Sequence, residues 1–97
     1  MSKTFTAQNP ATGQPVGNSI AEWDLVQTSA AIKAADSVKA KLSSTNPTQR
    51  AALLNAIADA IEEQKEKLAE TANQETALPM ARLTGEVMRT VIQIRAF

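Results

Sequence analysis

Hydrophobic positions recur every three or four residues between residues 24 and 42, which is the spacing of one face of an α-helix. The apolar or small side chains on that face are Thr28, Ala31, Ile32, Ala35, Val38 and Leu42. Asp24 and Gln27 have the spacing of a capping box, in which the two side chains bond reciprocally to the backbone of the first turn. The pattern therefore predicts a helix over residues 24–42.

A second helix is predicted over residues 46–74. Asn46 suits the cap, Pro47 suits the first helical position because no helical acceptor needs its missing N–H, and Gln49 completes a second capping box. The inward face consists of Leu53, Leu54, Ile57, Ala58 and Ile61. A charged run over residues 62–67, interpreted as a solvated face, separates this face from Leu68, Ala69 and Ala72. The helix is therefore predicted to continue or to bend near Glu62.

Pro79 interrupts this pattern and begins a third predicted helix over residues 79–97, because proline disfavours helical geometry in the residue before it. Its apolar positions are Leu83, Val87, Met88, Val91, Ile92, Ile94 and Phe97. A helix that is apolar around most of its circumference is usually buried on several sides. Since no Gly, Asn or Pro follows to end the helix, we expect that the polypeptide continues and covers this surface.

Turn-forming residues gather near the N-terminus, where two of the three glycines and two of the four prolines lie between residues 4 and 20. Asn9 and Pro10 suit the first positions of a turn, and Gly13 can adopt the positive φ that returns the chain. A β-hairpin is therefore predicted over residues 3–20. The predicted fold class is mainly α, with an N-terminal β-hairpin and three or four helices in a single segment, 1–97.

Composition narrows the possible functions. Ten Lys and Arg balance ten Asp and Glu, so there is no basic stripe and nucleic acid is not expected as a ligand. The chain contains neither Cys nor His, which excludes a thiolate nucleophile, a thiolate zinc site and a histidine general base. No apolar run resembles a signal peptide or a membrane span, so we expect a cytoplasmic protein with no membrane partner.

Three motifs in order resemble the start of an aldehyde dehydrogenase. The first is the hairpin NPATG, and the second is a helix of the pattern R-x-x-x-L-x-x-I-A-D-x-I-E, matched by Arg50, Leu54, Ile57, Ala58, Asp59, Ile61 and Glu62. The third, ETALP, departs from the family's usual Glu-Thr-Gly-Lys-Pro at Ala77 and Leu78. That departure, with the following ARLTGE, RT and RAF, is similar to the branch of α-ketoglutaric semialdehyde and NADP-linked fatty aldehyde dehydrogenases. The resemblance covers residues 9–97.

The resemblance implies that the chain is the N-terminal segment of the coenzyme-binding region of a larger α/β enzyme. The parent enzyme would oxidise an aldehyde to a carboxylic acid with NAD or NADP, and it would be a homo-oligomer. The family's nucleophilic Cys, its Glu base and its coenzyme-binding Gly turn have no counterpart among these residues. We therefore expect no catalytic, cofactor-binding or metal-binding residue in the chain, no activity when it is alone, and the rest of the enzyme as its partner.

In the family, the helix that ends near the Arg-x-Phe element borders the substrate tunnel. The resemblance therefore makes Gly85, Met88, Arg89 and Ile92 the candidate tunnel residues, and Arg89 could hold a substrate carboxylate. Two simpler roles remain open, namely pairing of Arg89 with Glu86 or with an acidic residue in the rest of the enzyme, and ordinary packing of Met88 and Ile92. A different function also stays open, in which the chain is a stand-alone helical module that binds a partner through its last helix.

Overall fold

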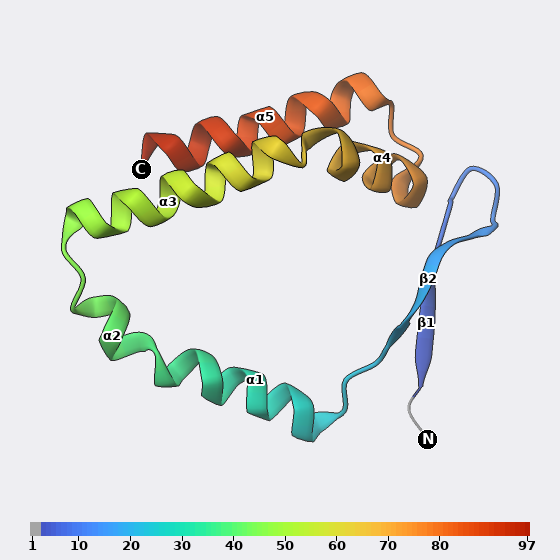
Figure 1. The fold of residues 1–97 in the computed structure, drawn as a ribbon. Helices are drawn as coiled ribbons and strands as arrows, with labels where there is room; N and C mark the ends of the chain where they lie inside the picture. The colour runs from blue at the N-terminus through green and yellow to red at the C-terminus, as the bar shows by residue number, and fades with distance from the viewer. Residues whose placement is uncertain (1–2) are drawn as a thin grey trace.

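The structure, a computed structural model, describes residues 3–97 and confirms a mainly helical chain with an N-terminal hairpin. The strands are β1 (Thr4–Gln8) and β2 (Pro15–Ala21). The helices are α1 (Leu25–Ser37), α2 (Lys39–Ser43), α3 (Pro47–Glu63), α4 (Lys65–Thr76) and α5 (Met80–Ala96). In Figure 1 the chain runs from the hairpin along α1 and α2, then back through α3 and α4, and finishes with α5.

The hairpin is antiparallel and changes register once. Its turn is held by an Asn9 side chain that accepts from the Ala11 N–H at 2.8 Å, and Gly13 has the positive φ of 72° that the sequence predicted. Between Phe5 and Ala7 the pairing shifts along β2, where Gly17 also has a positive φ. A bulge of this kind increases the local twist, and glycine accommodates its backbone conformation without a steric penalty.

Both capping boxes form as expected. The side chains of Asp24 and Asn46 each accept from the N–H of the third helical residue at 2.8 Å, and Gln27 and Gln49 bond back to the cap residues. Each box satisfies two backbone donors that an uncapped helix would leave to water. The starts of α1 and α3 are therefore fixed by contacts that span only four residues.

Each of the first two predicted helices is interrupted. The first divides at Val38, next to Ser37, whose hydroxyl donates to the Ala34 carbonyl at 2.7 Å and so competes with the helical pattern. The second divides at Gln64, whose N–H is shared between the carbonyls of Ala60 and Ile61. The continuous option for residues 46–74 is thus wrong, and the alternative of a bend near Glu62 describes the chain.

The turn from α4 to α5 depends on Ala77, which has the left-handed conformation with φ 61° and ψ 13°. Its N–H donates to the Asn73 carbonyl at 2.8 Å, while the Asn73 side chain donates to the Leu78 carbonyl at 2.7 Å. The Leu78 N–H is in turn bonded to the Thr76 hydroxyl. The bond from Ala77 is the last helical one of α4, and the two side-chain bonds then direct the chain into Pro79, the extended cap residue that precedes α5.

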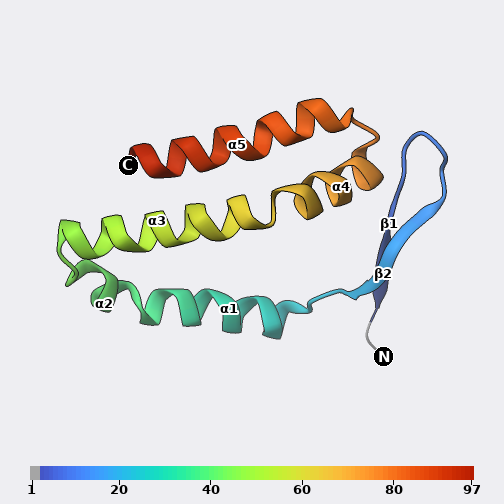
Figure 2. The same ribbon diagram turned by 45° about the horizontal axis from the view of Figure 1, so that its top comes forward.

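α5 runs antiparallel to α3 and α4 and packs along both, as Figures 1 and 2 show. These three helices form one layer. The buried side chains of residues 3–97 all belong to this layer and are Ala58, Ala69, Leu83 and Val91. Ala58 on α3 and Ala69 on α4 are small, so α5 can approach both helices closely. Its aliphatic side chains Leu83 and Val91 are buried as a result. No residue of α1 or α2 is buried.

The molecule is open and flat. Its radius of gyration is 17.5 Å, against about 13 Å for a compact domain of about 100 residues, and its thinnest dimension is 15 Å. Phe97 is 81% exposed and Ile92 is 63% exposed, so the apolar surface of α5 is only partly covered. Among residues 3–97, no helix combines the length and apolar character needed to cross a membrane.

Candidate functional site

The candidate site lies on α5, one side of which packs against α3 and α4. Leu83 and Val91 are buried against α3 and α4, and Val87 and Ile94 on the same side are half-buried. Full burial of one Val or Leu side chain stabilises a fold by roughly 1.5–3 kcal/mol, so this stripe is the main attachment of the helix. It orients the opposite side of α5 outward.

Gly85, Met88, Arg89 and Ile92 share that outward side. Their spacings of three and four residues place them on one face of the helix, away from the buried stripe. Met88 is half-buried and the other three are exposed. The structure thus brings the predicted residues together, but residues 3–97 supply no second wall facing them.

Arg89 forms the local ion pair that the sequence left open. Its Nε and Nη2 both lie 3.1 Å from Oε2 of Glu86, three residues earlier on α5. The Arg89 side chain is 78% exposed, so the pair is screened by water and adds little to stability. The guanidinium is therefore held near the outward face by a weak contact, which a carboxylate that binds both guanidinium nitrogens could replace.

Gly85 has no packing role among the described residues. A Cβ built at this position meets no atom within 4 Å, and its φ is an ordinary helical one. A glycine in the interior of a helix lowers stability by roughly 0.8–1 kcal/mol relative to alanine. No contact within residues 3–97 offsets this loss of stability. The absence of a side chain at Gly85 would let a ligand or another side chain approach the backbone of α5 closely.

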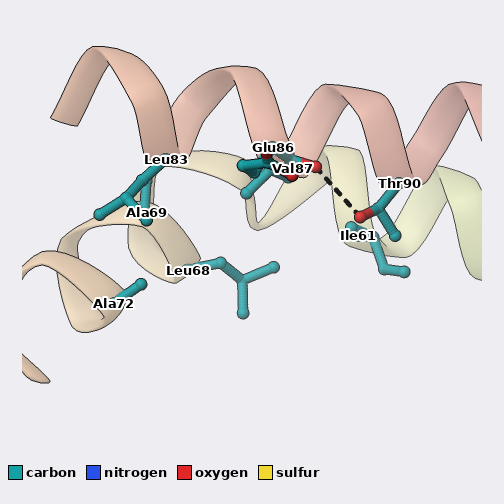
Figure 3. A pocket seen from close by; sticks show the side chains of 8 residues that line it. All are labelled: Ile61, Leu68, Ala69, Ala72, Leu83, Glu86, Val87 and Thr90. Atoms are coloured by element: carbon teal, nitrogen blue, oxygen red, sulfur yellow. Dashed lines mark hydrogen bonds between the residues drawn. The ribbon is translucent and has the colours of Figure 1, made fainter. Parts of the chain in front are cut away.

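An apolar groove lies on another side of α5, between this helix and the pair α3 and α4 (Figure 3). It has a volume of about 440 Å³, and its lining residues are Ile61, Leu68, Ala69, Ala72, Leu83, Glu86, Val87 and Thr90. The Thr90 hydroxyl donates to the Glu86 carbonyl at 3.0 Å, so its hydrogen is already used. The lining is mainly aliphatic, and Glu86 and Thr90 are its polar residues. The helical stripe containing Ile57 and Ile61 was the signal for it in the sequence.

Arg95 joins two of the quoted motifs across the layer. Its Nη2 donates to Oδ1 of Asp59 at 2.8 Å and to Oε2 of Glu62 at 2.6 Å. These hydrogen bonds, first to Asp59 and then to Glu62, raise the pKa of Arg95 above its ordinary value. The cluster connects the end of α5 to the C-terminal part of α3, a contact that sequence spacing could not reveal because 33 to 36 residues separate the partners.

A dinucleotide site of the parallel βαβ type is not formed within residues 3–97. Such a site uses a parallel βαβ unit whose free helix N-terminus receives the pyrophosphate. Here the sheet is an antiparallel hairpin, and the N-termini of α1 and α3 are occupied by the side chains of Asp24 and Asn46. Within residues 3–97 there is also no group of His, Cys, Asp and Glu side chains that could hold a metal ion.

Comparison with known proteins identifies the family. Residues 1–97 match the model of the aldehyde dehydrogenase family. The chain is 38% identical over 94 residues to the alpha-ketoglutaric semialdehyde dehydrogenase of Acinetobacter baylyi, covering 97% of this chain and 18% of that protein. It is 56% identical over 48 residues to alpha-ketoglutaric semialdehyde dehydrogenase 2 of Azospirillum brasilense, covering 50% of this chain and 9% of that protein. The chain spans less than a fifth of the length of these curated relatives, and it belongs to the aldehyde dehydrogenase family.

Proposed function

We propose that this chain is the N-terminal segment of an NAD(P)-dependent aldehyde dehydrogenase that oxidises an aldehyde to a carboxylic acid. The single observation that supports the activity is the family match along the whole chain. The segment itself contributes a helical layer and no reacting group, since it has neither Cys nor His. The coenzyme and the nucleophile are bound and supplied by the remainder of the enzyme. The proposal includes homo-oligomerisation, which the exposed hydrophobic side chains of the layer favour.

The substrate we propose is a semialdehyde of a dicarboxylic acid, of the kind named in both relatives. Such a molecule keeps one carboxylate at the end opposite its aldehyde. Arg89 is the exposed guanidinium on the outward face of α5, beside Met88 and Ile92. A bidentate pair with a substrate carboxylate would be stronger than its present exposed pair with Glu86.

The activity is tested by comparing two polypeptides, the 97-residue chain and the full-length enzyme. We expect that the full-length enzyme reduces NAD or NADP when α-ketoglutaric semialdehyde is added, and that the 97-residue chain gives no turnover. The formation of reduced nicotinamide is followed by its absorbance. Turnover by the short chain alone would contradict the proposal, and so would a full-length enzyme that oxidises no aldehyde.

The role of Arg89 is tested in the full-length enzyme by Arg89→Gln. Loss of a hydrogen bond to a charged group costs about 1.5–3 kcal/mol, so the KM for the semialdehyde should rise roughly 10- to 150-fold. The KM for an uncharged aldehyde of similar length should stay the same. Arg82→Gln, which removes another exposed α5 arginine, is the matched control and should change neither KM. An equal rise for both aldehydes would assign Arg89 a structural role instead.

A further inference from the structure

A short polar stripe runs along one side of α5. Glu86, Arg89 and Gln93 follow one another at spacings of three and four residues, so their side chains leave the helix on the same side. The stripe borders two hollows. Glu86 lines the apolar groove of Figure 3, while Arg89 and Gln93 line a smaller pocket of about 240 Å³ together with Thr90 and Ile94. The guanidinium of Arg89 therefore has open space beside it.

Glu86 occupies one binding edge of this guanidinium without using it fully. Nε and Nη2 of Arg89 both lie 3.1 Å from the same atom, Oε2 of Glu86. A single carboxylate oxygen thus contacts both nitrogens, whereas the strong bidentate pairing of arginine with a carboxylate uses two oxygens in parallel. Another carboxylate can bind this edge with two oxygens only after it displaces Glu86.

The displacement of Glu86 is a small barrier to such binding. The side chains of Arg89 and Glu86 are 78% and 51% exposed, so water can solvate the carboxylate of Glu86 once it is released. The loss of an exposed ion pair changes an equilibrium constant by roughly 1.5- to 5-fold. Glu86 therefore lowers the affinity of Arg89 for another anion and does not abolish it.

We propose that Glu86 is a specificity-determining residue, which competes with the substrate carboxylate for Arg89. This inference rests on the proposed function, because it takes Arg89 as the residue that holds that carboxylate. An anion that makes a single contact gains no more at Arg89 than Glu86 already supplies. A semialdehyde whose carboxylate reaches the guanidinium with both oxygens gains more and displaces Glu86. The pair thereby selects among anionic aldehydes through a competing element as well as an attractive one.

The test uses the full-length enzyme and compares α-ketoglutaric semialdehyde with pentanal, an uncharged aldehyde of the same chain length. The measured quantity is the ratio of the two kcat/KM values, semialdehyde over pentanal. We expect Glu86→Gln to raise this ratio roughly 1.5- to 5-fold, because the amide keeps the length and helix propensity of the side chain but loses its charge. Glu70→Gln, the same change at an exposed position of α4, is the matched control and should leave the ratio unchanged.

The double variant Glu86→Gln with Arg89→Gln separates competition for Arg89 from direct repulsion of the substrate. If Glu86 acts by occupying Arg89, its replacement has no further effect on the ratio once the guanidinium has been removed. A rise of the ratio that persists in the Arg89→Gln enzyme would show that Glu86 repels the substrate carboxylate directly, and it would overturn the inference.

The single variants show which proposal fails. If Arg89→Gln lowers the ratio but Glu86→Gln does not raise it, Arg89 still holds the substrate carboxylate and only the competition by Glu86 is wrong. If Arg89→Gln leaves the ratio unchanged, the proposed role of Arg89 and the inference about Glu86 are both wrong. A lower ratio in Arg89→Gln together with a higher ratio in Glu86→Gln is the result that we expect.

Discussion

At the scale of single residues, Ala77 is the clearest case of a backbone conformation that opposes the residue type. A non-glycine residue in the left-handed region crowds its Cβ against the following carbonyl, at a cost of roughly 1–2 kcal/mol. Ala77 is the one non-glycine residue between 3 and 97 with a positive φ. The family pattern that the chain resembles has Gly at this position of the Glu-Thr-Gly-Lys-Pro motif. The bonds made by Asn73 and Thr76 hold the turn in spite of this strain.

We therefore expect Ala77→Gly to stabilise the protein by up to about 1 kcal/mol, after allowing for the larger backbone entropy of glycine in the unfolded chain. The free energy of unfolding is measured in urea by circular dichroism. Ala60→Gly is the matched control, because Ala60 lies inside α3 with an ordinary φ, and it should destabilise by about 1 kcal/mol. A loss of stability in both variants would show that Ala77 is unstrained in solution.

At the scale of helices, Arg95 fixes α5 on α3. One guanidinium nitrogen reaches two carboxylates, so the contact specifies both the register and the antiparallel direction of the pair. A lysine would reproduce it only in part, because an ammonium is more strongly hydrated than a guanidinium and loses more hydration when it pairs. The hydrophobic stripe of α5 drives the association, and Arg95 selects one arrangement of it.

We expect Arg95→Met to lower the midpoint of thermal unfolding, because two neighbouring carboxylates would lose their shared cation. Arg95→Lys should recover only part of the loss, and Glu62→Gln combined with Arg95→Met should destabilise by less than the sum of the single changes. Since the pKa of Arg95 is raised, its contribution is fully present below the ordinary arginine pKa and disappears only as the pH rises through the raised value. Additive effects in this thermal series would exclude a coupled cluster.

The features of the fold that could be predicted from the sequence are those that depend on contacts between residues close together in the chain. The capping boxes at Asp24 and Asn46 and the positive φ of Gly13 are decided within a few residues, so spacing alone predicted them. The break at Val38 depends on competition among bonds of nearly equal strength, which a periodic pattern does not register, whereas the charged run at residues 62–67 had left a bend near Glu62 open. The link from Arg95 to Asp59 needs the folded path of the chain.

At the scale of the whole molecule, the candidate site is a single face of α5. The fold is open and flat, so no other element lies over that face among residues 3–97. Sequence reasoning placed Gly85, Met88, Arg89 and Ile92 on one helix, and they share its outward face. Among residues 3–97 no second wall faces them. The groove between α4 and α5 was also missed as a site, because Leu68 and Leu83 meet only after the turn at Ala77.

The reciprocal caps of α1 and α3 also affect the denatured state. Each cap is complete within a stretch of four residues and needs no distant partner. Nascent helix can therefore persist at residues 24–28 and 46–50 after the layer has come apart. Because little surface is buried to begin with, unfolding exposes little more, and the dependence of stability on denaturant concentration is shallow for a chain of this length.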